Sequence, residues 1–101
     1  MNEIMTTDQM DTRIDAVSAL LVAAAPGLDI KVDEMTLPHC QPTAYVWVGE
    51  LGGVCITGTG DDEATYAACD DLCIPYRTHA TADEAVRELT RICAPAWSVA
   101  A

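Results

Sequence analysis

Helix-capping patterns near both ends of the chain restrict the fold more than any other feature of the sequence. Thr6 stands three residues before Gln9, and Thr81 stands three residues before Glu84. At this spacing a hydroxyl caps the first turn of a helix, and the later side chain bonds back to the cap. Apolar residues recur every three or four positions behind each cap, so we predict an amphipathic helix at each end of the domain.

The apolar stripe of each helix indicates how far the helix extends. We predict that the first helix ends at Pro26-Gly27 and the second at Pro95, because proline lacks the N–H that continues a helix. Short tails then remain at about 1–6 and about 95–101. The stripe residues are Met10, Ile14, Val17, Leu20 or Leu21 and Ala24 in the first helix, and Ala82, Ala85, Val86, Leu89 and Cys93 in the second.

Between the two helices the sequence has the alternation of β-strands. Residues 28–37 place Leu28, Ile30 and Val32 on one side of an extended chain, which is the pattern of a half-buried strand. Residues 43–58 carry β-branched and aromatic residues on two arms around a glycine-containing turn, which predicts a β-hairpin. These segments indicate an antiparallel sheet.

One segment, residues 61–73, allows two interpretations. As a helix it would place a tyrosine and two cysteines on one side, and as a meander it would contribute to strands at about 65–69 and 74–79. The meander is favoured, because residues 75–86 look like a strand that leads directly into the capped helix. We therefore predict a single α+β domain over residues 1–101, with an N-terminal helix, an antiparallel sheet of about four strands and a C-terminal helix.

The acidic residues are concentrated in the middle of the chain. The formal net charge is −11, and residues 32–76 contain 8 acids and no lysine or arginine, whereas residues 77–101 contain 3 acids and 3 arginines. Such a surface repels nucleic acids and anionic membranes, and it attracts cationic partners within a Debye length of about 8–10 Å. We therefore predict a basic protein surface as the partner, with no direct binding to nucleic acid or membrane. The predicted contact residues are Asp33, Glu34, Glu50, Asp61, Asp62, Glu63, Asp70 and Asp71, with Tyr45, Trp47 and Tyr66 as aromatic anchors.

An acidic surface of this kind can offer a row of anions like the phosphate backbone of DNA. Carboxylates on adjacent helical turns lie about 5–6 Å apart, and alternate residues of a strand lie about 6.6 Å apart. In its size, its charge and its lack of a catalytic motif, the chain resembles the small acidic inhibitors that phages and mobile elements encode, anti-CRISPR proteins among them. The resemblance implies a non-enzymatic inhibitor that occupies the basic surface of a nucleic-acid-binding protein or complex.

Two other interpretations of the charge stay open. The acidic excess can serve solubility alone, without any partner. Alternatively, the chain is an antitoxin or immunity protein that neutralises one basic toxin.

The cysteines suggest a different function, a zinc- or thiol-stabilised module. Cys69, Cys73 and His79 are the alternative metal ligands, but structural zinc sites normally combine two close pairs of ligands, and the chain has one close cysteine pair. A catalytic thiol is disfavoured because Cys69 lies beside two aspartates, whereas reactive thiolates need a cationic setting. Buried thiols are the favoured interpretation, without metal or enzymatic activity.

Other parts of the sequence bear on cofactors and on cellular location. The glycine spacings match neither a dinucleotide fingerprint nor a P-loop, so no cofactor is predicted. The apolar run Ala19–Ala25 is too short to span a membrane, and the first residues lack the basic start of a secretory leader. We expect a cytoplasmic protein whose five cysteines are reduced.

Overall fold

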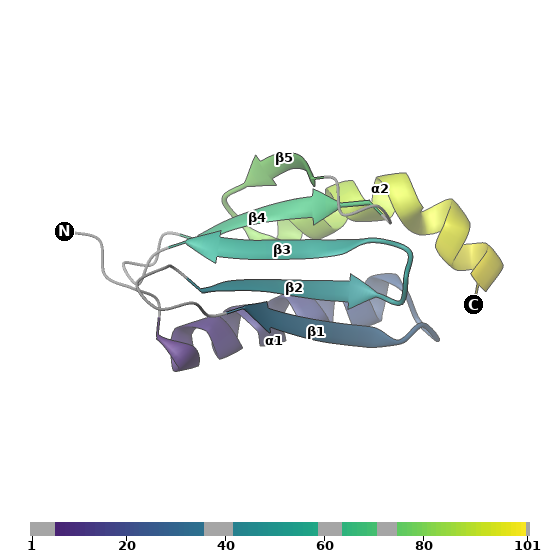
Figure 1. The fold of residues 1–101 in the computed structure, drawn as a ribbon. Coiled ribbons are helices and arrows are strands. Elements are labelled where there is room, and N and C mark those ends of the chain that lie inside the picture. The colour runs from purple at the N-terminus through teal and green to yellow at the C-terminus, as the bar shows by residue number, and fades with distance from the viewer. Residues whose placement is uncertain (1–5, 36–41, 59–63, 71–74, 101) are drawn as a thin grey trace.

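A computed structural model of the chain describes residues 6–35, 42–58, 64–70 and 75–100, and it has the predicted α+β order of elements (Figure 1). The elements are α1 (Thr7–Ala24), β1 (Ile30–Met35), β2 (Thr43–Val48), β3 (Gly53–Gly58), β4 (Ala64–Cys69), β5 (Pro75–His79) and α2 (Ala82–Ala100). The sheet has five strands and not about four as predicted. The strand interpretation of the ambiguous segment is confirmed over Ala64–Cys69, and the helical one is wrong there.

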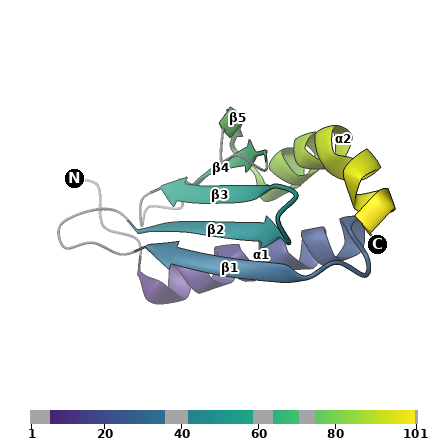
Figure 2. The ribbon, with the colours of Figure 1, turned by 45° about the vertical axis from the view of Figure 1, so that its right-hand side comes forward.

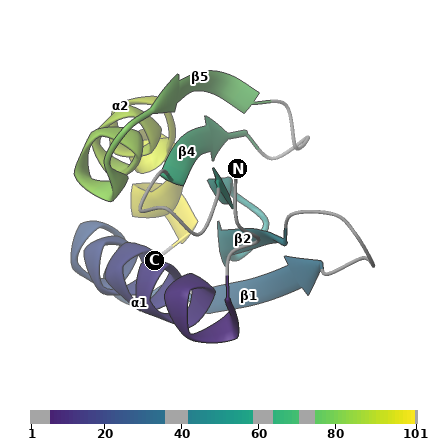
Figure 3. The same ribbon diagram turned by 90° about the vertical axis from the view of Figure 1, so that its left-hand side faces the viewer.

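The five strands form one antiparallel meander, in which each strand pairs with its neighbour in the chain. The predicted hairpin is present as β2 and β3. On the sheet, α1 runs along β1 and β2, while α2 contacts β3, β4 and β5 (Figure 2). Viewed from the end, both helices lie on the same face of the sheet and contact each other (Figure 3). The domain therefore has two layers.

The first helix begins at its predicted capping box. The Gln9 N–H donates to Thr6 Oγ1 at 3.1 Å, and the Thr6 N–H donates to Gln9 Oε1 at 2.8 Å. The helix ends at Ala24, just before Pro26, and Gly27 then adopts a φ of +86°, which glycine tolerates because it has no Cβ. The predicted stripe faces the core, where Met10, Ile14, Val17 and Leu21 are buried.

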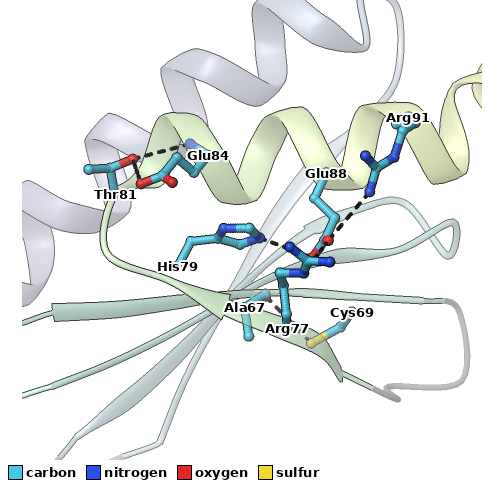
Figure 4. A network of polar contacts seen from close by, with 8 residues as sticks. All are labelled: Ala67, Cys69, Arg77, His79, Thr81, Glu84, Glu88 and Arg91. Carbon is cyan, nitrogen blue, oxygen red and sulfur yellow. Dashed lines mark hydrogen bonds and ion pairs between the residues drawn. The ribbon is translucent and has the colours of Figure 1, made fainter.

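The second helix also begins at its predicted cap (Figure 4). The Glu84 N–H donates to Thr81 Oγ1 at 3.2 Å, and the Thr81 hydroxyl donates to Glu84 Oε1 at 2.9 Å. The predicted hydroxyl cap is confirmed, but the Glu84 carboxylate bonds to the capping hydroxyl and not to the Thr81 N–H as in a full capping box.

The predicted end of this helix is wrong, because α2 continues through Pro95 to Ala100, and the expected tail from residue 95 is helical. A proline inside a helix costs about 3 kcal/mol relative to alanine. Burial of Trp97 offsets this cost, since the residue is 3% exposed and its Nε1–H donates to the Leu51 carbonyl at 3.3 Å. Trp97 follows Cys93 by four residues, so it continues the apolar stripe that the proline signal obscured.

The core lies between the sheet and the two helices. Its largest fully buried aliphatic side chains are Val17, Leu21, Val46, Val48, Val54, Ile56 and Leu89. β1 was predicted to be half-buried, but only Ile30 is partly covered, and Val32 is 47% exposed. The reason is its position, because β1 is an edge strand with a neighbour on one side only. Among the described residues, neither helix combines the length and apolarity needed to cross a bilayer.

Candidate partner-binding surface

Two aromatic rings lie on the face of the sheet opposite the helices. In β2 the side chains alternate, so that Ala44 and Val46 are buried in the core, while Thr43, Tyr45 and Trp47 are half-buried on the other face. The rings of Tyr45 and Trp47 stack with their centroids 5.2 Å apart and their planes within 1° of parallel. We call this side of the sheet the open face, because neither helix packs on it (Figure 3).

The residues of β1 opposite this stack add charge to the open face. Asp33 pairs with Tyr45, and Lys31 pairs with Trp47. Directly opposite residues of an antiparallel pair lie on the same face, and both charged side chains are exposed. The structure therefore brings one predicted acid, Asp33, beside the two predicted aromatic anchors.

On its other side the stack is bordered by Cys55 of β3, which pairs with Tyr45. Burial raises the pKa of the Cys55 thiol, and a hydrogen bond with Tyr45 partly opposes this effect. A thiol with a raised pKa stays protonated near neutral pH and is a poor nucleophile. The described cysteines Cys55, Cys69 and Cys93 form no disulfide.

The other predicted acids are not all on the open face. Glu34 pairs with the core residue Ala44, so it points to the helix side of β1, although it is exposed. Glu50 is exposed in the turn between β2 and β3, and Asp70 follows β4 at the same end of the sheet. The predicted contact residues Asp61, Asp62, Glu63 and Asp71 lie outside the described residues.

The third predicted anchor, Tyr66, lies in the core. It pairs with Ile56, is 8% exposed and belongs to the buried cluster between sheet and helices. Its face of β4 is therefore opposite to the face that carries Tyr45 and Trp47. Of the three predicted anchors, Tyr45 and Trp47 are therefore the two that lie on the described surface.

Three further acids, which the sequence analysis did not single out, lie on α1. Asp8, Asp11 and Asp15 are exposed and follow one another at intervals of three and four residues, so they share one side of the helix. The three aspartates lie at helical positions between those of the apolar stripe. The spacing of the stripe was therefore the sequence signal that these side chains are exposed. Because α1 packs against β1 and β2, the three aspartates lie on the helix next to the strand that carries Asp33 and Glu34. We call these five residues the acidic edge.

The two edges of the sheet differ in charge. Strand order follows chain order, so residues near the two ends of the chain lie at opposite edges of the sheet (Figure 1). Residues 7–35, at the β1 edge, contain six acids and two bases, whereas residues 75–100, at the β5 edge, contain three acids and three arginines. Of these two edges, the β1 edge is therefore the one that attracts a cationic partner.

A second polar cluster lies between β5 and α2. The Glu88 side chain is 8% exposed, and its Oε1 lies 3.1 Å from His79 Nε2. Its Oε2 lies 3.5 Å from Arg77 Nε and 3.5 Å from Arg91 Nη2 (Figure 4). Burial opposes ionisation of Glu88, but hydrogen bonds with the His79 side chain and the Arg77 backbone, together with the nearby charge of Arg77, outweigh burial, so the pKa of the carboxyl is lowered.

Only part of this cluster could be expected from the sequence. The pairing of Arg91 with Glu88 follows from their spacing of three residues on a helix. The burial of Glu88 was missed, although the residue stands three positions after the buried Ala85, in the phase of the apolar stripe. An acidic residue at a position of the apolar stripe is the sequence signal for a buried carboxylate.

The alternative zinc ligands are not brought together in the described residues. Cys69 is 2% exposed, and its thiol donates to the Ala67 carbonyl at 3.7 Å. It pairs with Gly53 of β3, whereas His79 pairs with the core residue Tyr66 and contacts Glu88. Cys73 lies outside the described residues, within which no three potential ligands are close enough to hold a metal ion.

Comparisons with protein-family models, with curated proteins and with solved structures found no match for this chain.

Proposed function

We propose that this chain is a non-enzymatic binding protein that inhibits a nucleic-acid-binding protein or complex by occupying its basic surface. The observation that carries the proposal is the stacked pair Tyr45 and Trp47 beside the exposed Asp33, on a face that no described helix covers. Aromatic rings supply most of the contact energy in many interfaces, and neighbouring charges select the partner and speed association.

The preformed stack favours binding without rearrangement. Tyr45 and Trp47 are already held parallel on a strand, so little side-chain entropy is lost when a partner covers them. Both are flanked by paired strands on either side, which makes the surface a rigid one. A partner contact here needs no catalytic group.

The acidic edge supports the nucleic-acid mimicry in this proposal. Asp8, Asp11 and Asp15 lie on adjacent turns of α1, where side chains are about 5–6 Å apart. A row of carboxylates at this spacing presents negative charge to lysines and arginines as a phosphate backbone does. This is the mode of action that the likeness to small phage-encoded inhibitors, such as anti-CRISPR proteins, implies.

The first test is capture of partners from a host-cell lysate at low salt, with the tagged chain as bait, in the presence and absence of duplex DNA. We expect retention of a nucleic-acid-binding protein or complex that added DNA displaces. Retention of one basic protein that DNA does not displace would instead favour the antitoxin alternative. If no protein is specifically retained, the proposed function fails.

The second test locates the surface on the captured partner. Asp15→Lys/Asp33→Lys reverses two charges of the acidic edge, and we expect a loss of at least about tenfold in affinity. The matched control, Asp29→Lys/Asp83→Lys, changes the net charge equally at two exposed aspartates outside the acidic edge. Equal losses in both variants would mean that total charge, and not the acidic edge, determines binding.

A further inference from the structure

A pocket of about 230 Å³ opens beside Glu88, at the edge of the sheet farthest from β1. Every residue that lines it has an ionisable side chain: Arg77, His79, Glu84, Arg87, Glu88 and Arg91. The pocket gathers three of the five lysines and arginines of a chain whose net charge is −11. With three arginines and two glutamates in its lining, it is locally cationic in an acidic protein.

The arginines retain most of their hydrogen-bonding capacity. Arg77 and Arg91 each reach Glu88 with one contact of 3.5 Å, and their side chains are 76% and 73% exposed. A guanidinium has about five N–H donors, and charge-assisted bonds are typically about 2.7–2.9 Å long. Arg87 is exposed and has no hydrogen bond or ion pair with another described residue. Neutralisation of Glu88 therefore does not account for all three arginines.

Glu88 holds two of these arginines in place around the pocket. Arg77 comes from β5 and Arg91 from α2, and both approach the same carboxylate oxygen (Figure 4). Arg87 lies one turn before Arg91 on α2, so it is on the same side of the helix. Three guanidinium groups are thus presented around one small space, and two of them are positioned before any ligand arrives.

We infer that this pocket binds a small oxyanion of the phosphate type. The planar guanidinium matches the oxygens of a phosphate group and can donate two parallel bonds to them. Pockets for whole drug-sized ligands have volumes of about 300–1,000 Å³, so the space here suits one such group. The inference does not rest on the proposed function, because the pocket lies away from the acidic edge.

The test is a titration of the isotope-labelled chain with inorganic phosphate at constant ionic strength, followed by the arginine side-chain and α2 amide resonances. We expect saturable shifts around the pocket. Arg87→Gln should weaken phosphate binding by about tenfold, the loss of one charge-assisted hydrogen bond. Because Arg87 contacts no described residue through a polar bond, the amide spectrum should show an intact fold. Lys31→Gln, which removes the same charge from β1, should leave phosphate binding unchanged.

A second arm of the titration uses phosphoserine and identifies the source of the phosphate group. Tighter binding of phosphoserine than of inorganic phosphate would assign the pocket to a phosphorylated side chain, and the reverse order would assign it to free phosphate. Shifts that do not saturate, or equal weakening by Arg87→Gln and Lys31→Gln, would overturn the inference.

Discussion

At the scale of the residue, Glu88 is a buried acid whose chemistry is changed by its neighbours. It is almost removed from water, which disfavours its charged form, yet His79, Arg77 and Arg91 surround it and favour that form. Loss of the negative charge weakens the hydrogen bond with His79 and leaves Arg77 and Arg91 without the anion that they contact. Among the acids that the structure describes, Glu88 is distinguished by its burial.

Replacing Glu88 with glutamine should lower the free energy of unfolding at neutral pH by about 1–3 kcal/mol. The pKa of Glu88 is lowered in the folded state relative to its ordinary value of 4.5, so its contribution is complete above that value. The contribution is lost as the pH falls through the folded pKa. Urea unfolding at several pH values should therefore show wild type and Glu88→Gln converging in acid. Asp83→Asn, on the exposed side of the same helix, should not show this difference.

Gly52 is required by its surroundings and by its backbone angle. Its φ is +109°, and a Cβ at this position would lie 2.9 Å from the Cys69 carbonyl oxygen and 3.1 Å from Cys93 Sγ. We expect Gly52→Ala to lower the free energy of unfolding by about 2–3 kcal/mol. Gly49→Ala is the matched control, because Gly49 has a φ of +55° with open space around its Cβ position, and about 1 kcal/mol is expected there. Equal losses in denaturant unfolding would contradict the steric argument.

At the scale of the element, α2 shows where reading the sequence succeeds and where it fails. Its start is predictable, because Thr81 and Glu84 form a cap from residues close in sequence. Its end is not, because Pro95 is a local signal for termination, and it is overridden by the burial of Trp97 against Leu51, a residue 46 positions away. The exposure of β1 was missed for a related reason, since alternation predicts two faces but does not show that a strand lies at the sheet edge.

If Trp97 keeps the last turns of α2 helical, its removal should have a large effect. Trp97→Ala should lower the free energy of unfolding by about 3–5 kcal/mol, as is usual for large-to-small changes in a core. Far-ultraviolet circular dichroism should show a loss of helix beyond Pro95. Val99→Ala is the control, because Val99 is 88% exposed and its change should stay within about 0.5 kcal/mol. An unchanged helix content in folded Trp97→Ala would show that Pro95 is accommodated without it.

At the scale of the whole molecule, the meander converts the order of residues into a position across the sheet. The charge imbalance and the aromatic pair Tyr45 and Trp47 were predictable, because composition and strand alternation depend on neighbouring residues. The pocket between β5 and α2 was not, because it joins residues of two elements whose packing no local pattern specifies. The same is true of the buried position of Tyr66, which depends on which face of β4 meets the helices.

The acidic edge should make stability depend on salt. Repulsion among Asp8, Asp11, Asp15, Asp33 and Glu34 is screened over a Debye length of about 10 Å at 0.1 M salt. The melting temperature should therefore rise when sodium chloride is added to a low-salt buffer. Asp15→Asn should reduce this rise, whereas Asp83→Asn, in a region where acids and arginines are equal in number, should not. Identical salt responses would place the repulsion elsewhere.

The match between strand order and chain order also affects how the chain folds. Each strand can pair with the one made just before it, so the loops that close are short, and the entropy lost in closing them is small. The contact of α1 with α2, in contrast, joins the two ends of the chain. We expect a transition state in which the β2–β3 hairpin is formed and α2 is not yet docked. Stopped-flow kinetics should then show that Val54→Ala slows folding, while Trp97→Ala mainly accelerates unfolding.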